Sequence, residues 1–388
     1  MAIRHYLDHN ATAPLRPEAR AAMLLALDQF GNPSSIHAEG RAARGLIEEA
    51  RAQVAALVGA RPANVVFTSG GSEAAALALS PDFVKGGQRA DCLLLGAGEH
   101  PCVLTGHRFP TEQAKIVKIG DDGRLDLDHL RETLSGLDGA RPMLALQMAN
   151  NETGVVQPVA EAAAMVAQAG GWTLCDVVQA AGRIVVDRQS SAVDALILSA
   201  HKFGGPKGIG ALIFDNKTME IRSKLIRGGG QEKGHRAGTE NVAGIAGFGA
   251  AAAAALAELG QEEQRLLDLR QQCEQRLLAL APDLVLFGKQ APRLPNTLAF
   301  AIPGLSAETL LMALDLAGIS ISSGSACSSG KVQASHVLAA MGIAPELAKG
   351  ALRISMGWST TPADIDGLCL ALQKVLSTMR VRRPVAVA

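Results

Sequence analysis

The sequence predicts an α/β fold, with a large domain built on a mainly parallel sheet and a smaller α+β domain. From about residue 60 to 215, short apolar runs alternate with helix-forming stretches, which is the pattern of a parallel sheet covered by helices. Beyond residue 280 the apolar runs are shorter, and 388 residues are enough for two cores. We therefore expect a large domain at 15–258 and a small domain made of 1–14 and 259–388.

The expected elements follow from the apolar runs and their flanking turn residues. A long helix or a pair of helices is expected at 244–280, where it would bridge the two domains. The last expected helix has Thr361 as its N-cap and Pro362 at its first position. The expected strands are 65–67, 92–95, 143–148, 172–175, 195–198, 210–214, 284–287, 297–301 and 351–356, and the further helices are 307–316, 335–341 and 362–379.

The composition limits the function. Lys and Arg together number 37, as do Asp and Glu, so no broad basic field would attract nucleic acid or an anionic membrane. We expect no signal peptide, and the apolar stretch at 242–256 indicates a buried helix too short to span a bilayer. The six cysteines form neither a CxxC pair nor a disulfide framework. We therefore expect reduced thiols in a cytoplasm, and no metal site.

The most informative motif is Ser199-Ala200-His201-Lys202, which directly follows the apolar run ending at Leu198. Burial disfavours an ammonium group, so a lysine at the end of a buried strand can attack a carbonyl and form a Schiff base. The Gly-rich turn that follows keeps this lysine at the rim of the sheet. The alternative is a surface lysine at a strand end.

Polar residues follow several other strands, where ligands bind in α/β sheets. Gly70-Gly71-Ser72 opens a helix after one strand and can cradle a phosphate, although a helix start capped by Ser69 or Ser72 is the alternative. His100 and Asp176 follow two more strands, with Gln179 three residues beyond Asp176. A loop histidine and a helix N-cap are the alternatives for His100 and Asp176.

Together these residues predict a site for pyridoxal phosphate. The cofactor needs an aldehyde-reactive lysine, a carboxylate for its ring nitrogen, a phosphate cup and a group that stacks on its ring. Lys202, Asp176, the turn at 70–72 and His100 are residues of those types.

Five motifs then resemble the cysteine desulfurases, a class V group of fold-type-I pyridoxal phosphate enzymes. The resemblance runs from residue 6 to about 366, with the motifs in the order of the family. It departs from the family at Ala76, Val177 and Val178. The matching motifs lie at 6–12, 30–35, 150–154, 199–202 and 236–241.

The resemblance implies a role for each matching residue. Lys202 and His100 would be catalytic, and Thr239 would reach the phosphate of a second subunit in a homodimer with shared sites. Asn151 and Arg353 would hold the substrate carboxylate, a structural salt bridge being the alternative for Arg353. The implied cofactor-binding residues are Gly71, Ser72, His100, Asp176, Gln179, Ser199, His201, Lys202 and Thr239.

One thiol stands out from the other cysteines. Cys327 lies in the run Ser-Ser-Gly-Ser-Ala-Cys-Ser-Ser-Gly at 322–330, whose small residues predict a mobile loop rather than a buried site. A linker with an incidental cysteine is the alternative. The run resembles the persulfide-forming loop of the desulfurases, in its long form. Cys102, close to His100, is the rival, whereas Cys92, Cys175, Cys273 and Cys369 fall within predicted strands or helices.

The implied reaction converts L-cysteine to L-alanine and leaves the sulfur as a persulfide on Cys327. The sulfur acceptor stays open, between an iron–sulfur scaffold protein, a thiolation enzyme and others. A selenocysteine lyase or a class V transaminase is the nearest alternative, and a non-catalytic scaffold is disfavoured because Lys202, Asp176 and Cys327 are all present.

Overall fold

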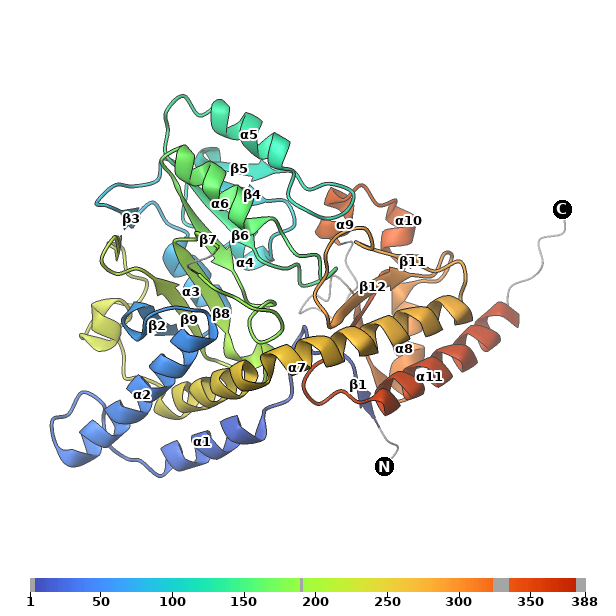
Figure 1. The fold of residues 1–388 in the computed structure, drawn as a ribbon, viewed down its shortest axis with the longest axis horizontal. Coiled ribbons are helices and arrows are strands. Elements are labelled where there is room, and N and C mark those ends of the chain that lie inside the picture. Colours follow the sequence, from blue (N-terminus) through green and yellow to red (C-terminus); the bar gives the residue numbers. More distant parts are fainter. Residues whose placement is uncertain (1–3, 189–190, 324–334, 382–388) are drawn as a thin grey trace.

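The computed structural model describes residues 4–188, 191–323 and 335–381 of the chain. Figure 1 shows two main sheets in this described part, with the long helix α7 (Val242–Leu280) running past both. The larger sheet has seven described strands in the order β2-β9-β8-β7-β6-β4-β5. Their bounds are β2 (Val65–Thr68), β4 (Cys92–Gly96), β5 (Ala114–Val117), β6 (Pro142–Gln147), β7 (Trp172–Asp176), β8 (Ala195–Ser199) and β9 (Gly210–Phe214).

This sheet is mainly parallel, as the sequence predicts. Strands β5, β4, β6, β7 and β8 all run parallel to one another, and β9 is antiparallel to its neighbours β8 and β2. Parallel strands bring their carboxyl ends to one edge of the sheet. Gln147, Asp176 and Ser199, the last residues of β6, β7 and β8, therefore lie at the same edge.

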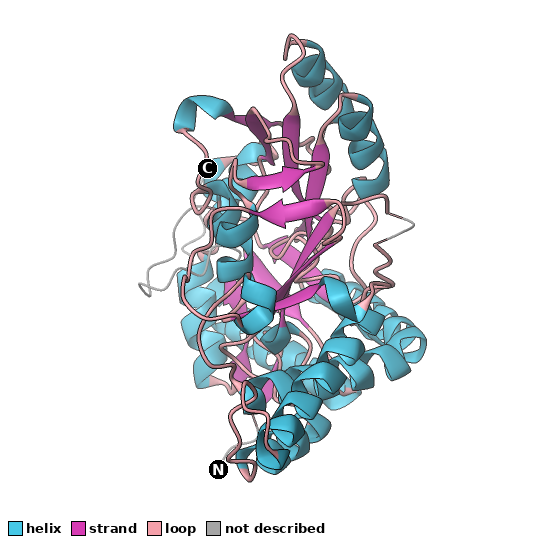
Figure 2. Cartoon of the chain, turned by 90° about the vertical axis from the view of Figure 1, so that its left-hand side faces the viewer, coloured by secondary structure: helices cyan, strands magenta, loops and turns pink. Residues whose placement is uncertain are grey.

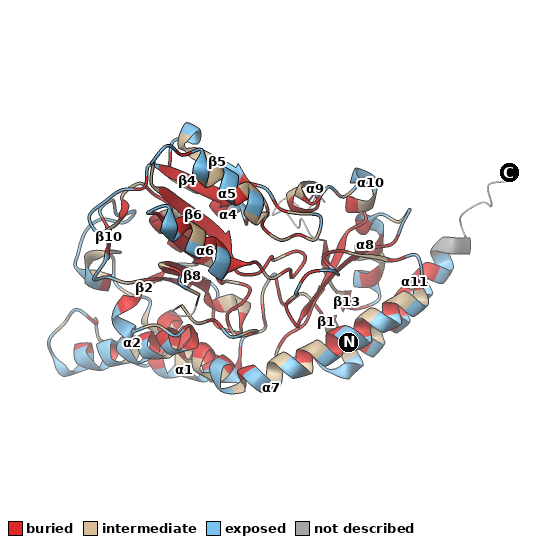
Figure 3. Ribbon diagram, turned by 45° about the horizontal axis from the view of Figure 1, so that its top comes forward, coloured by how far each residue is buried: buried red, intermediate tan, exposed pale blue. Residues whose placement is uncertain are grey.

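Both faces of the larger sheet are buried, because alternate residues of a strand enter different cores. Leu94 belongs to a core shared with α2 (Ala38–Leu57), α5 (Leu127–Ser135), α6 (Val159–Gln168) and α7, whereas Leu93 belongs to a core shared with α3 (Gly71–Ala78) and α4 (Pro101–Leu104). Burial on both faces explains the nearly continuous apolar runs of these strands. Figure 3 shows the buried strands surrounded by helices with exposed outer faces.

Helix α7 joins the large core to the small one. Phe248 and Ala252 in its first half pack in the large core, near α1 (Pro17–Leu27), and Leu269 and Leu277 in its second half pack in the small core. The predicted bridge is thus a single helix rather than a pair. Its 39 residues are long and apolar enough to cross a membrane, so our expectation of a stretch too short to do so was wrong. Of its apolar window, 56% is buried inside the protein, as in a core helix.

The smaller sheet is antiparallel in the order β11-β12-β15-β14, and helices pack beside it. In Figure 2 the half with the larger sheet faces the viewer, and helices lie on both sides of its strands. The pairing of β1 with β13 attaches the N-terminal segment to this half of the protein. The bounds are β1 (His5–Tyr6), β11 (Val285–Leu286), β12 (Thr297–Ala301), β13 (Ile319–Ser320), β14 (Ser322–Ser323), β15 (Leu352–Ser355), α8 (Ala307–Leu316), α9 (His336–Ala340), α10 (Pro345–Ala348) and α11 (Pro362–Val381).

The structure adds elements that the sequence did not predict. Strand β5 is at the sheet edge with Ile116 exposed, so its apolar run is too short and interrupted to stand out. The start of α11 is fixed by the Thr361 N–H, which donates to the Asp364 carboxylate at 2.8 Å. Strands β1, β13 and β14 and helices α1, α2, α5, α6 and α10 were not among the expected elements either. Further added elements are the antiparallel pair β3 (Phe83–Lys85) and β10 (Met219–Ile221), and 3-10 turns at Pro62–Asn64, Thr111–Gln113, Ala200–Lys202 and Gln231–Gly234.

Candidate active site

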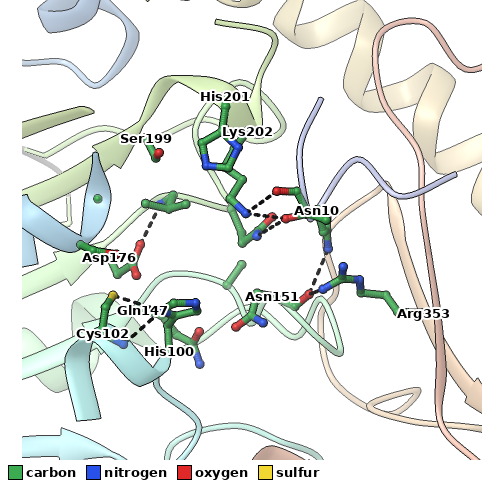
Figure 4. A pocket seen from close by; sticks show the side chains of 16 residues that line it. Asn10, His100, Cys102, Gln147, Asn151, Asp176, Ser199, His201, Lys202 and Arg353 are labelled. Carbon is green, nitrogen blue, oxygen red and sulfur yellow. Dashed lines mark hydrogen bonds between the residues drawn. The ribbon is translucent and has the colours of Figure 1, made fainter. Parts of the chain in front are cut away.

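A cavity of about 350 Å³ lies at the carboxyl ends of the parallel strands. Figure 4 shows that its side chains come from both halves of the protein. Among the residues that line it are ten of the predicted site residues: Gly71, Ser72, His100, Asn151, Asp176, Gln179, Ser199, His201, Lys202 and Arg353.

Backbone carbonyls hold the Lys202 side chain at the edge of the larger sheet where the parallel strands have their carboxyl ends. It ends the 3-10 turn that follows β8, and its Nζ donates to the Asn10 carbonyl at 2.7 Å and to the Ala11 carbonyl at 2.9 Å. Burial, followed by the charges of Arg353 and Arg183, lowers the pKa of Lys202 to about 8. An appreciable fraction of the amine is therefore neutral and nucleophilic near neutral pH. The alternative of an ordinary surface lysine is excluded by this setting.

Asp176 is at the end of β7 and also lines the cavity. Burial raises the pKa of Asp176 to about 6, against the lowering effects of the Val178 N–H, 2.9 Å from Oδ1, and of the Lys202 charge. A protonated ring nitrogen would be the cation that such a carboxylate lacks. Behind it, Glu99 is fully buried, and burial holds the pKa of its carboxyl well above the ordinary value.

The start of α3 is an open cup for a phosphate. Its N-cap is Gly70, which provides no side-chain cap, so the alternative of a helix start capped by Ser69 or Ser72 is wrong. A Cβ at Gly71 would lie 3.3 Å from the Val178 side chain and 3.6 Å from the Ser199 Cβ, so a side chain there would crowd the cup. The uncapped N–H groups and the helix dipole suit an anion. The residues thus fit pyridoxal phosphate at both its phosphate and its ring nitrogen.

His100 and Cys102 form a neutral pair across the cavity from Lys202 (Figure 4). The Nδ1 of His100 accepts from the Cys102 N–H at 3.2 Å and lies 3.0 Å from the Cys102 Sγ. Desolvation, then the charges of Lys202 and His336, lowers the pKa of His100 to about 4. Burial, then Asp176, raises the pKa of Cys102 to about 12. Cys102 therefore stays a thiol near neutral pH, which makes it a poor rival nucleophile.

Arg353, on β15 of the smaller sheet, and Asn151, in the loop after β6 of the larger sheet, both line the cavity. The Arg353 Nη1 donates to the Asn151 carbonyl at 2.7 Å, and Nη2 donates to the Asp8 carboxylate at 2.8 Å. Arg353 thus lies at the cavity, as predicted. Its ion pair is with Asp8, in a segment that we assigned to the same small domain, and so is not the salt bridge between domains that was the alternative. The Arg353 Nε is buried without a partner among the described residues.

Two predicted site residues remain besides the ten that line this cavity. Thr239 is exposed and does not line it. Cys327 lies outside the described residues. Four other cysteines, Cys92, Cys175, Cys273 and Cys369, are buried in strands or helices as expected.

The sequence analysis missed several residues that shape the site. Gln147 is the last residue of β6, so the rule that strand ends carry ligand-binding residues would have found it. Asn10 and Ala11 act through backbone carbonyls, which leave no sequence signal. Arg183, beside Gln179, is also part of the surroundings of Lys202.

Comparison with known proteins identifies the family. Residues 5–368 match the model of the class-V aminotransferases. The chain is 41% identical to a cysteine desulfurase of Cereibacter sphaeroides over 98% of both chains. It is 37% identical to the cysteine desulfurase IscS of Dictyoglomus turgidum, over 98% of this chain and 96% of that protein.

A solved structure agrees. The NifS-like protein of Rickettsia africae superimposes with a TM-score of 0.87 at 33% identity, covering 96% of this chain and 99% of that one. With the cavity, its lysine and its phosphate cup, these matches lead to one conclusion. The chain belongs to the class-V aminotransferase family and is a pyridoxal-phosphate-dependent cysteine desulfurase.

Proposed function

We propose that this desulfurase converts L-cysteine to L-alanine and holds the released sulfur as a persulfide on Cys327 for transfer to an acceptor protein. The observation that carries the proposal is the joint placement of Lys202, Asp176 and Arg353 around one cavity. One related structure, titled SspA in complex with cysteine, has 27% identity and a TM-score of 0.75.

Different residues of the cavity would bind different parts of the cofactor. Lys202 would hold it covalently, Asp176 would pair with its ring nitrogen, and Gln179 would contact its ring hydroxyl. Bound in this way, pyridoxal phosphate supplies an electron sink for the bond broken at the substrate Cα. His100 would cover the ring face, and the phosphate would be held by Gly71, Ser72, Ser199 and His201.

The substrate carboxylate would lie against Arg353 and Asn151, which face the cavity opposite the α3 cup. A guanidinium matches a carboxylate in geometry as well as in charge. Lys202 Nζ, with its pKa lowered to about 8, would take the proton from the substrate Cα.

In the sulfur step, a sulfur atom moves from the substrate thiol to the thiol of Cys327, and atoms and electrons balance. The Cys327 thiolate attacks the substrate sulfur, a sulfur–sulfur bond forms, and the carbon–sulfur bond breaks. The electron pair of that bond stays on carbon, which takes up a proton to become the methyl group of alanine. The sulfur is thus oxidised and the carbon is reduced, with no further reductant or oxidant.

The anchoring of the two flanks of 324–334 supports the choice of Cys327. On one flank, Ser322 of β14 pairs with Arg353 of β15. On the other flank, the Ser335 hydroxyl donates at 2.5 Å to Glu152, the neighbour of Asn151. Both ends of this segment are therefore attached beside the two residues proposed to hold the substrate carboxylate.

A homodimer with shared sites is also proposed. Thr239 is exposed and does not line the cavity of its own subunit. This is what we expect of a residue that contacts the cofactor of a second subunit. Apolar side chains are exposed on and after α1, among them Leu25 at 68%, Phe30 at 89% and Ile36 at 90%. Such side chains suit a contact between copies. Light scattering after gel filtration should give twice the chain mass, and a fully active monomer would contradict this.

The test of the sulfur step is Cys327→Ser. A serine hydroxyl is scarcely ionised near neutrality, so this variant should still bind cofactor and show a spectral change with L-cysteine. It should form no persulfide and release little alanine. Cys102→Ser tests the rival thiol. Persulfide retained in Cys327→Ser but lost in Cys102→Ser would contradict the proposal, and a selenocysteine lyase would tolerate Cys327→Ser with its selenium substrate.

The cellular setting completes the proposal. We propose a cytoplasmic enzyme whose acceptor is a protein such as an iron–sulfur scaffold. Its free, buried cysteines are compatible with a reducing compartment. Incubating the enzyme with radiolabelled cysteine and purified candidate acceptors should move the label from Cys327 to one of them.

A further inference from the structure

Arg183 is a buried arginine next to the cofactor cavity. Arg183 lies in the turn after β7, and only 4% of its surface is exposed. Nη1 donates to the Gln179 backbone carbonyl at 2.7 Å and to the Gln179 Oε1 at 2.5 Å. Nη2 donates to the carbonyls of His9 at 3.3 Å and Lys202 at 3.1 Å. Among the described residues, no carboxylate pairs with it.

The first consequence concerns the orientation of the Gln179 amide. A guanidinium has only donors, so the amide must turn its oxygen toward Arg183 and its NH2 group away from it. One of the two amide hydrogens is used by the Asn10 carbonyl, at 3.1 Å from Nε2. Gln179 lines the cavity, so the remaining hydrogen is available there as a donor.

The second consequence concerns the charge around Lys202. Burial, then Arg353, lowers the pKa of Arg183 to about 9, so Arg183 still carries its positive charge near neutral pH. Its Nη2 donates a hydrogen bond to the Lys202 backbone carbonyl, and its charge disfavours a second positive charge at Lys202 Nζ.

The other charges facing Lys202 differ from Arg183. Arg353 also disfavours the ammonium form, but it is paired with Asp8 at 2.8 Å, and Asp8 favours that form. Asp176 favours it too, and His201 is kept neutral because burial and then Lys202 lower its pKa to about 4. Arg183 is thus the cation near Lys202 that no described carboxylate offsets.

We propose that Arg183 is a positioning residue of this site, which turns the Gln179 amide so that it presents a donor to the ring hydroxyl and which places a positive charge without a described carboxylate partner beside Lys202. This rests on the proposed function, in which Lys202 and Gln179 contact the cofactor. Arg183 itself does not line the cavity.

Two variants separate the two roles. Arg183→Gln removes the charge, and Arg183→Lys keeps the charge but loses the planar pair of donors. Arg270→Gln is the matched control, because Arg270 is also buried, 8% exposed, but on α7 and outside the cavity. Circular dichroism and thermal melting of each variant first establish that it folds.

The reactivity of Lys202 is measured on the full chain after cofactor removal, by trinitrobenzenesulfonate labelling with peptide mapping across neutral and alkaline pH. Arg183→Gln should raise the midpoint by up to about one pH unit, because burial and Arg353 lower the Lys202 pKa more than Arg183 does. Arg183→Lys and Arg270→Gln should leave it close to the original. In the holoenzyme, the pH dependence of the visible absorbance should shift in the same order.

The amide role is measured by the dissociation constant for pyridoxal phosphate. Arg183→Lys should weaken binding about tenfold, because one ammonium cannot replace the two guanidinium nitrogens that donate to Gln179 and to the His9 and Lys202 carbonyls, so the Gln179 Oε1 loses its fixed donor. An unchanged midpoint in folded Arg183→Gln, or an equal shift in Arg270→Gln, would overturn the role of the charge. Unchanged affinity in Arg183→Lys would overturn the amide role. Borohydride fixation of the cofactor to another lysine in the unaltered protein would instead overturn the proposed function.

Discussion

Arg51 and Arg183 are both buried in the larger half of the protein, yet their surroundings are opposite. Arg51 donates two bonds of 2.8 Å to the Glu232 carboxylate, and its guanidinium lies 4.8 Å from the centre of the Phe67 ring. Glu232 also accepts from the Phe67 N–H at 2.8 Å. Within the described ranges, the hydrogen-bond partners of Arg183 are all neutral oxygens.

The difference shows that this fold pairs a buried charge that only stabilises the structure, and leaves without a described carboxylate partner a buried charge that lies next to the active site. A paired buried charge is cancelled where it stands, so its effect is local and structural. An unpaired one acts on its neighbours, as Arg183 does on Lys202. Around the cavity, burial is the first cause that moves several pKa values toward neutral pH. Lys202 is lowered to about 8 and Asp176 is raised to about 6. Displaced pKa values of this kind are typical of active sites.

Lys202→Ala should give the largest effect on the functional side of this comparison. No other lysine lines the cavity in the described part of the chain, so desulfurase activity should fall by more than about 10³-fold. Cofactor that remains bound should be removable after borohydride treatment, whereas in the unaltered protein it should stay fixed to Lys202. Mass spectrometry of the treated protein checks this. Covalent cofactor on Lys202→Ala would show that another residue binds the cofactor, and it would contradict the role that we assign to Lys202.

Arg51→Met should give a large effect on the structural side. It leaves Glu232 buried without its cation, which costs about 3–5 kcal/mol of unfolding free energy. Denaturant unfolding measures this loss, while the pH midpoint of Lys202 labelling should not move. The double variant Arg51→Met with Glu232→Gln should recover part of the stability, because no lone buried charge remains. A shifted Lys202 midpoint in Arg51→Met would show that the two regions are not separate.

Glu152→Gln should give the smallest effect, since Glu152 has a neutral partner, the Ser335 hydroxyl. Burial raises the pKa of Glu152 from 4.5 to about 7, although Ser335 and Arg353 oppose this. The folded state therefore keeps a proton that the unfolded state loses, so this residue's contribution is complete below about pH 4.5 and is lost as the pH rises through about 7. Glutamine has no such dependence. The variant should gain about 1–3 kcal/mol relative to the unaltered protein across that window, measured by melting at a series of pH values.

The sequence predicted much of the fold, because the strands of the larger sheet are buried on both faces. Trp172–Asp176 and Gly210–Phe214 appear within a residue or so of their expected bounds. The antiparallel direction of β9 and the edge strand β5 were not predicted. Strand direction and edge pairing depend on partners distant in sequence, and an edge strand lacks the continuous apolar run.

The same division holds at the site. By itself, the sequence determined the residue types: an amine after an apolar strand, a carboxylate after another, and a glycine-rich helix start. These are local patterns with a local chemical meaning. Only the tertiary structure decided that Arg353, from the smaller sheet, faces the same cavity as Lys202. Only it decided that no described carboxylate pairs with Arg183, because burial, pKa values and the orientation of an amide are set by neighbours that the chain brings together from far apart in the sequence.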